Sequence, residues 1–250
     1  MINKQNVKNV MILSKHQAFK QTSQFICMAK AMKMDVNGDP NIGLYGIATD
    51  KFCLLGKVVP KKHIKKIEQT LGVPVYQIKL YGTDLIGIFA VGNSKCVLIP
   101  DIMFDSELEE LKKLPIKFVT INTEKTALNN NIVCNDEIAI VSKDYTKDEV
   151  KQIKQALGVK VIQTNIAGTN LPGSCTTMTN KGAICNPNAS DHEVKKIEKE
   201  FGKEIGLGTI NLGNNFVSSG LIANSNGFIV GELTSGHEIM RIDESLGFVD

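Results

Sequence analysis

A short polar turn recurs five times along this chain at a nearly constant spacing, and this repeat restricts the possible folds more than any other feature. With one polar residue of each turn as a reference, the steps between copies are 43, 42, 45 and 44 residues. The reference residues are Asp50, Asn93, Asn135, Asn180 and Asn224. Five units of about 44 residues follow, at approximately 34–80, 81–124, 125–166, 167–210 and 211–250.

Each unit carries the signals of a hairpin followed by a helix. The reference turns lie between short apolar runs, such as 85–91 and 97–99, which predicts strand, tight turn and strand. Three helices are expected to begin with capping boxes, and the other two near Pro60 and Asp105. The capping boxes are Thr146-x-x-Glu149, Ser190-x-x-Glu193 and Ser235-x-x-Glu238. Gly72, Gly158, Gly202 and Gly247 provide C-terminal caps, and a further strand such as 73–78 is expected after the helix.

A unit of two or three strands and one helix cannot bury both faces of its sheet, so the copies must pack on one another. An open row would expose strand edges at both ends, whereas five units around an axis leave only short, protected edges. The sequence therefore predicts an α/β fold, a five-bladed pseudo-symmetric propeller with strands inside and helices outside.

The positive net charge is confined to the start of the chain. Residues 1–33 carry six lysines and no Asp or Glu, whereas the other 217 residues carry 23 basic and 26 acidic groups, a net charge of −3. We therefore expect one folded domain at 34–250, preceded by a basic extension. Two interpretations of the extension stay open: a start codon assigned too early, with Met28, Met32 or Met34 as the true start, or a disordered tail that touches RNA.

The six cysteines are widely spaced, contain no CxxC pair and follow no secretory signal, so a reduced cytoplasmic setting without zinc fits them. Cys53 and Cys96 each lie three residues after a reference residue, which predicts small buried hydrophobic side chains. His63, His192 and His237 fall early in the expected helices and should face solvent.

Several phrases in order resemble the translation initiation factor 6 family of archaea and eukaryotes, the ribosome anti-association factors. The similarity spans about 34–249 and includes Asn41-Ile42-Gly43, Gly82-x-x-Leu85-Ile86-Gly87, Val91-Gly92-Asn93, Thr126-Ala127-Leu128-x-Asn130, Cys134-Asn135-Asp136, Thr179-Asn180-Lys181-Gly182, Ala223-Asn224-Ser225-x-Gly227 and Leu246-Gly247.

The resemblance implies a pentein fold and a factor that binds the intersubunit face of the large ribosomal subunit and blocks premature joining of the small subunit. The implied partner is chiefly a ribosomal protein beside the sarcin-ricin loop, with minor contact to ribosomal RNA. It implies a cytoplasmic monomer of archaeal type, with roles in subunit biogenesis and initiation and with no catalytic residue, cofactor, metal or membrane contact. The implied ribosome-binding residues are Asn93, Asn130, Asn135, Asp136, Asn180 and Asn224.

Three features depart from the family pattern. Asn129 replaces a glycine, and because Asn tolerates positive φ we expect the turn to survive. Leu212 replaces a basic residue, which removes one charged contact. The basic extension is absent from the family.

Alternative functions stay open, and so do purely structural roles for some of these residues. Penteins include guanidine-modifying enzymes, but the expected cysteine is missing from 211–250 and the expected histidine from 125–166. A propeller axis could also bind a small ligand. The turn asparagines could serve the turns alone. The lysine-rich helix faces at 61–66 and 195–199 could be solubilising surface or a weak RNA contact.

Overall fold

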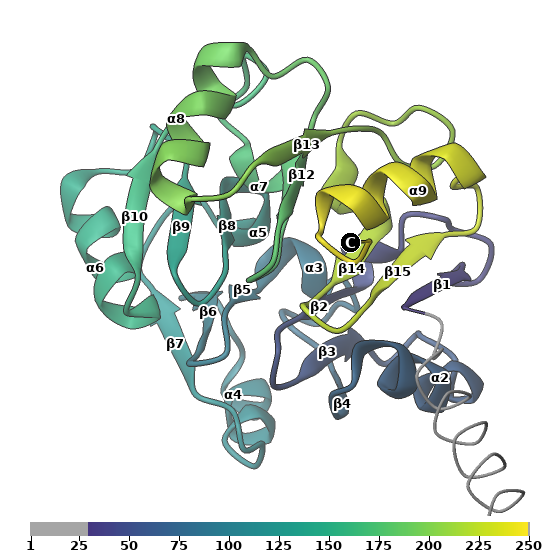
Figure 1. Ribbon diagram of the computed structural model, residues 1–250. Helices are drawn as coiled ribbons and strands as arrows, with labels where there is room; N and C mark the ends of the chain where they lie inside the picture. The colour runs from purple at the N-terminus through teal and green to yellow at the C-terminus, as the bar shows by residue number, and fades with distance from the viewer. Residues whose placement is uncertain (1–29, 250) are drawn as a thin grey trace, which may run out of the picture.

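The computed structural model describes residues 30–249 and contains five three-stranded sheets arranged around a common axis (Figure 1). In each sheet an inner strand pairs antiparallel with a middle strand, and the middle strand pairs parallel with an outer strand. We call each sheet with its helices a blade. The strands, in the order inner, middle, outer, are β2 (Gly46–Ala48), β3 (Cys53–Gly56) and β4 (Val75–Ile78) in blade 1; β5 (Val91–Gly92), β6 (Val97–Pro100) and β7 (Phe118–Ile121) in blade 2; β8 (Ile132–Cys134), β9 (Ile138–Val141) and β10 (Lys160–Gln163) in blade 3; β11 (Thr176–Met178), β12 (Ala183–Cys185) and β13 (Ile205–Leu207) in blade 4; and β14 (Leu221–Ala223), β15 (Phe228–Gly231) and β1 (Ala31–Met34) in blade 5.

The predicted five-bladed α/β architecture is thus confirmed. A long helix lies outside each sheet and a short helix precedes each inner strand near the axis (Figure 1). The outer helices are α2 (Lys61–Leu71), α4 (Asp105–Leu111), α6 (Lys147–Leu157), α8 (Asp191–Phe201) and α9 (Gly236–Ser245). The short helices are η1 (Ile42–Tyr45), α3 (Ile86–Phe89), α5 (Leu128–Asn131), α7 (Pro172–Cys175) and η2 (Val217–Gly220).

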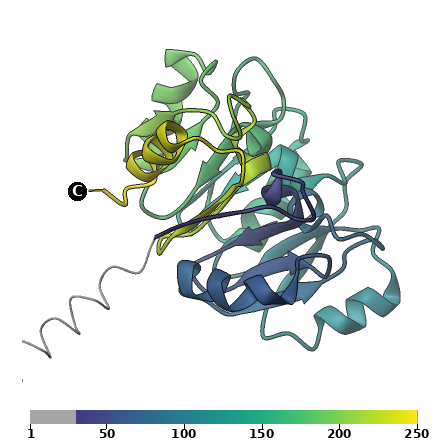
Figure 2. The same cartoon turned by 90° about the vertical axis from the view of Figure 1, so that its right-hand side faces the viewer.

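The fifth blade closes the ring with a strand from the opposite end of the described chain. Strand β1 pairs in parallel with β15, from Ala31 opposite Phe228 to Met34 opposite Gly231, and the two strands lie side by side in Figure 2. The expected boundary at residue 34 is therefore placed too late, because the blade 5 sheet needs 31–33. Met32 and Met34 are buried in this strand, so a chain that started at Met34 would lack most of it. The rest of the basic extension, 1–29, lies outside the described residues.

The helix ends follow the local sequence signals. Thr146, Ser190 and Ser235 each accept a hydrogen bond from the backbone N–H of the glutamate three residues later, which confirms the three capping boxes. Gly72, Gly158 and Gly202 take left-handed conformations at the C-terminal ends, where a residue with a Cβ would be strained.

The hydrophobic core consists of five clusters, each between two neighbouring blades. Cys96 and Leu98 of blade 2, for example, pack against Ile153 and Leu157 on α6 of blade 3. On the seam between blades 5 and 1, Met32 and Ile229 pack against Ile67. Because each blade contributes to two clusters, the apolar surface is buried only in the closed ring.

Candidate functional site

The axis has two structurally different ends, and the predicted binding residues are divided between them. The hairpin turns between inner and middle strands form the turn end. The short helices before the inner strands form the short-helix end. Asn130 lies at the short-helix end, and the other five candidates lie at the turn end. Asn131 and the three residues of β8 lie between Asn130 and Asn135, and the strand alone is about 10 Å long.

At the turn end, the structure corrects the register of the repeat. The first residue of each turn donates its backbone N–H to the carbonyl three residues later. The five equivalent residues are Thr49, Asn93, Asn135, Thr179 and Asn224, so Asp50 and Asn180 occupy the next position, and the steps become 44, 42, 44 and 45. In this register Phe52, not Cys53, is the counterpart of Cys96, although all three side chains are buried.

The three asparagines at the first position connect neighbouring blades. Asn93 donates its side-chain amide to the carbonyls of Asn135 and Leu157, and Asn135 donates to the carbonyl of Thr179. Asn224 donates to the carbonyls of Thr49 and Leu71, across the seam between blades 5 and 1. Each Oδ1 also accepts the backbone N–H groups of the residues two and three positions later in its own turn. These amides are buried, 5% exposed or less, so their polar groups are used inside the protein.

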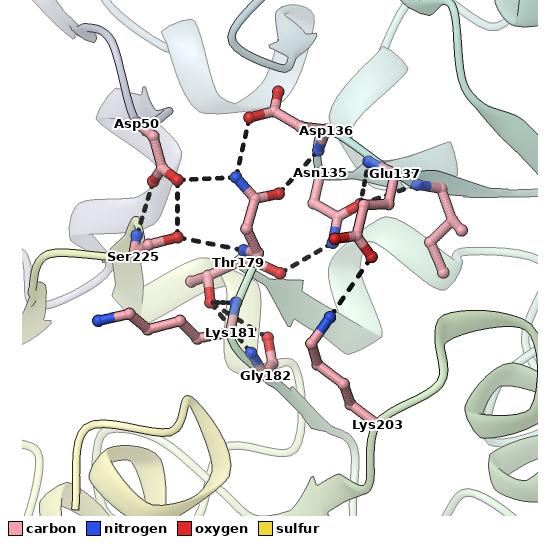
Figure 3. Close-up of polar contacts among 11 residues, drawn as sticks. Asp50, Asn135, Asp136, Glu137, Thr179, Lys181, Gly182, Lys203 and Ser225 are labelled. Atoms are coloured by element: carbon pink, nitrogen blue, oxygen red, sulfur yellow. Dashed lines mark hydrogen bonds and ion pairs between the residues drawn. The ribbon is translucent and has the colours of Figure 1, made fainter.

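The residues at the second position of the five turns form a chain of polar contacts around the axis (Figure 3). They are Asp50, Ser94, Asp136, Asn180 and Ser225. Asn180 is its centre: Nδ2 donates to the carboxylates of both Asp50 and Asp136, at 2.7 and 2.8 Å, and Oδ1 accepts the backbone N–H of Asp136. Ser94 donates to Asp136, and Ser225 donates to Asp50, through hydroxyl and backbone N–H in each case. Ser94 and Ser225 were missed as functional candidates, although their positions directly after Asn93 and Asn224 were a usable signal.

These contacts stabilise negative charge at the axis. Burial alone would raise the pKa of Asp136, but hydrogen bonds from Ser94 and Asn180 outweigh it and lower the pKa below its usual value. The cavity at this end measures only about 20 Å³, room for about one water molecule. A second cavity further along the axis, lined by strands and short helices, measures about 60 Å³. Ligand pockets typically measure about 300 Å³ or more, so neither cavity fits a small organic ligand.

At the short-helix end, backbone atoms of neighbouring blades approach each other closely. A Cβ added to Gly43, Gly87 or Gly173 would lie within 2 Å of a carbonyl oxygen of the adjacent short helix. Asn129 is the fourth member of this series, and its Nδ2 donates to the carbonyl of Gly87 at 2.8 Å. The turn survives with Asn129 as expected, but the expected reason is wrong: the φ of Asn129 is not positive, and glycine serves close approach at the equivalent positions. Asn replaces the backbone contact with a side-chain hydrogen bond.

Asn130 differs from both of its neighbours in the Asn129–Asn131 run. Asn131 donates its amide to the carbonyl of Ala127 within the same turn, and Asn129 bonds to the next blade. Among the described residues, the half-buried Asn130 side chain has no hydrogen-bond partner in the protein. It is the one candidate whose amide is available to another molecule.

Apolar side chains are exposed at the same end. Leu171 and Phe216 directly precede two adjacent short helices and are 37% and 42% exposed. Leu212, at the position where the family resemblance implies a basic residue, has φ +62° and is 70% exposed. In blade 2, Tyr81 stacks on Phe104 with ring centroids 5.6 Å apart, and both rings are exposed. Exposed apolar residues at the same end as a free amide are suited to contact with a protein partner.

The described residues contain no cluster of three or more His, Cys, Asp or Glu side chains that could hold a metal ion. Burial raises the pKa of the Cys53, Cys134 and Cys185 thiols, which disfavours the nucleophilic thiolate. His192 and His237 face solvent as predicted, whereas His63 is half-buried. Within 30–249, no helix combines the length and apolar character needed to cross a bilayer.

Comparison with known proteins identifies the family. The model of the eIF-6 family matches residues 31–245, so the chain belongs to this family. Translation initiation factor 6 of Pyrococcus horikoshii is 36% identical over 223 residues, which cover 87% of this chain and 98% of the relative. The protein of the same name from Saccharolobus islandicus is 34% identical over 218 residues, 86% of this chain and 98% of the relative. These matches support a role as a translation initiation factor and the pentein assignment of the fold.

One solved structure, an agmatine deiminase from C. jejuni, aligns with a TM-score of 0.33 and 15% identity over 46% of each chain. An overlap this partial defines neither a shared activity nor a shared site.

Proposed function

We propose that this protein binds the intersubunit face of the large ribosomal subunit and sterically prevents its premature association with the small subunit, in subunit biogenesis and in initiation. In this proposal the protein acts without catalysis, as a cytoplasmic monomer, and its main partner is a ribosomal protein beside the sarcin-ricin loop. The family membership and the names of the relatives support a translation role. A net charge of −3 over 34–250 suits docking on a protein, because few phosphates need to be neutralised.

We further propose that the short-helix end carries the contact. The observation behind this proposal is the difference between Asn130 and the other five candidates. Asn93, Asn135 and Asn224 are buried, and Asp136 and Asn180 bond to each other within the axial chain. The Asn130 amide has no partner among the described residues and lies at the end that exposes Leu171 and Phe216. A free amide at an end that also exposes apolar side chains matches the composition of protein interfaces.

Two alternatives are less well supported. Binding of a small ligand at the axis would need more space than the 20 and 60 Å³ cavities offer. A guanidine-modifying enzyme would need a reactive cysteine, and the described cysteines are all buried.

The test is sedimentation of the protein with archaeal ribosomal subunits in sucrose gradients, scored for co-migration with large subunits and for joined ribosomes. Wild type should co-migrate with large subunits and reduce joining. Asn130→Arg should weaken binding by about 2 kcal/mol, a loss of roughly thirtyfold in affinity, because a bulky charge replaces a central amide.

The matched control is Asn226→Arg, which places the same charge on an exposed residue at the turn end. It should bind like wild type. If Asn226→Arg impaired co-migration and Asn130→Arg did not, the turn end would be the contact. No co-migration of the wild type would refute the function itself.

A further inference from the structure

We propose that the outer face of α2 binds the phosphate backbone of RNA without regard to sequence. This α2 lysine face consists of Lys61, Lys62, Lys65 and Lys66. The inference rests on the proposed function, because it adds an RNA contact beside the protein contact at the short-helix end.

Comparison of the five outer helices singles out α2. It carries four lysines and one glutamate, a net charge of +3. The corresponding charges are −4 for α4, +1 for α6, −1 for α8 and −2 for α9. Because the blades share one architecture, this difference comes from the sequence of α2 and not from its place in the fold.

The third residue of α2 also differs from that of the other four outer helices. In blades 2, 4 and 5 this residue is a glutamate that accepts backbone N–H groups from the loop before the short helix; Glu238, for example, binds Leu212 and Gly213. In blade 1 it is His63, and the N–H of the corresponding loop residue, Gly38, is bound by Asp35 instead. A surface groove of about 350 Å³ lies at this place, lined by Lys33, Lys62 and His63 with Asp35 and Glu232.

The four lysines are free to meet a polyanion. All four are exposed, and none forms an ion pair within 30–249. They recur at i, i+1, i+4 and i+5, which places them along one side of the helix. Like charges at i and i+4 repel, and positive charge at a helix N-terminus opposes the helix dipole. A bound anion would remove both unfavourable interactions.

The chemistry favours RNA phosphates over a membrane or a base sequence. Lysine acts on phosphate as a point charge and lacks the two-pronged geometry with which arginine reads a base. The opposite side of α2 is buried in the core by Ile67 and Leu71, and α2 exposes no large apolar side chain that could enter a bilayer. Binding through this face should therefore be electrostatic and independent of sequence.

The position of the face fits a contact beside the proposed protein interface. Each outer helix begins directly after a middle strand that runs from the turn end toward the short-helix end. Lys61 and Lys62 therefore lie toward the end that carries Asn130. A partner bound at the short-helix end would have the basic first turn of α2 at the edge of its interface.

The experiment measures binding of the full chain to a fluorescent 20-base-pair RNA duplex of arbitrary sequence by anisotropy, between 50 and 200 mM KCl. In the test variant Lys61, Lys62, Lys65 and Lys66 are all replaced by Gln. The matched control replaces four exposed lysines of blade 3, Lys143, Lys147, Lys151 and Lys154, by Gln. Both variants keep residues 1–29, so the extension contributes equally to both. Their thermal unfolding should match that of wild type.

The α2 variant should reduce the slope of log affinity against log salt by about 3 and weaken binding at 0.1 M salt by at least about tenfold, as expected for four lost phosphate contacts. The control should change the slope by less than about 1. Equal losses in both variants, or no binding by wild type, would overturn the inference. Loss of binding to anionic phospholipid vesicles but not to RNA would overturn it as well. Co-migration with large subunits, tested through Asn130, can succeed or fail independently of these results.

Discussion

The two ends of the axis repeat the same five-fold pattern, but neighbouring blades are joined differently at each. Side-chain hydrogen bonds join them at the turn end, and close backbone contacts join them at the short-helix end. At the turn end, Asn93, Asn135 and Asn224 direct their amides into the next blade. At the short-helix end, glycines allow carbonyl oxygens of adjacent blades to come close, and Asn130 is left without an internal partner. Polar residues at repeated positions are therefore not equivalent as binding candidates. An amide that bonds to the next blade is not available to bind another molecule.

The largest effect is expected from Gly87→Ala, which breaks the backbone contact at the short-helix end. The new Cβ would lie 1.8 Å from the Gly43 carbonyl oxygen and 2.8 Å from that of Gly46, so two blades would have to separate. We expect the free energy of unfolding to fall by more than about 3 kcal/mol in urea titrations.

Gly236→Ala is the control for Gly87→Ala, because a Cβ there meets nothing within 4 Å. It should change stability by less than about 0.5 kcal/mol. A Gly87→Ala protein as stable as wild type would show that the short helices can part without cost.

At the turn end, Asn224→Ala should destabilise by about 3 kcal/mol. It leaves the Thr49 carbonyl and two backbone N–H groups of its own turn without their partner in a buried site. Asn226→Ala removes an exposed amide that donates to the same Leu71 carbonyl as Asn224 and should cost less than about 1 kcal/mol. Equal costs for the two variants would contradict the role of buried amides in closing the ring.

Glu238→Gln tests the hydrogen bonds at the start of α9, toward the short-helix end. Burial would raise the pKa of Glu238, but hydrogen bonds from Ser235, Gly213 and Thr209 lower it from 4.5 to about 2. A lowered folded-state pKa stabilises the protein above pH 4.5, and this contribution is lost as the pH falls toward 2.

We therefore expect Glu238→Gln to cost about 2 kcal/mol at pH 7, with a difference from wild type that shrinks steadily below pH 4.5. Denaturant titrations across this pH range measure it. Glu204→Gln, at an exposed glutamate, should have little effect at any pH. If the destabilisation caused by Glu238→Gln did not change with pH, it would come from altered packing and not from loss of the carboxylate charge.

The smallest effect is expected from Asn129→Gly, which restores at blade 3 the residue found at Gly43, Gly87 and Gly173. The variant loses the hydrogen bond to the Gly87 carbonyl, a change of about 1 kcal/mol measurable in the same titrations. An increase in stability would mean that crowding by the Asn129 Cβ outweighs its hydrogen bond.

Much of the fold could be predicted because it depends on local signals. Capping boxes such as Thr146 with Glu149, cap glycines such as Gly158, and apolar runs around each turn act within a few residues. The register of the turns was harder, because Asp50 and Asn180 are polar like Asn93 but occupy the next position. Only the hydrogen bond from each turn to the residue three positions later distinguishes them.

The candidate site could be predicted as a set of residues but not as a surface. The sequence favours Asn130 over Asn135 only because the run 129–131 precedes a strand and does not lie at a hairpin tip. Spacing cannot tell which side of a blade a polar side chain bonds to. In the structure the Asn135 amide binds the next blade, whereas that of Asn130 does not.

The number of blades, the order of strands and helices in each blade, and the concentration of lysine on α2 can be predicted from the sequence, because they depend on neighbouring residues and on a repeat of about 44. The tertiary structure decided how the ring closes and which polar groups stay free. The chain must pass around the whole ring before β15 can pair with β1. The partners of the buried amides are 42 or more residues away in the sequence. Such pairings depend on the packing of complete blades, which no local pattern encodes.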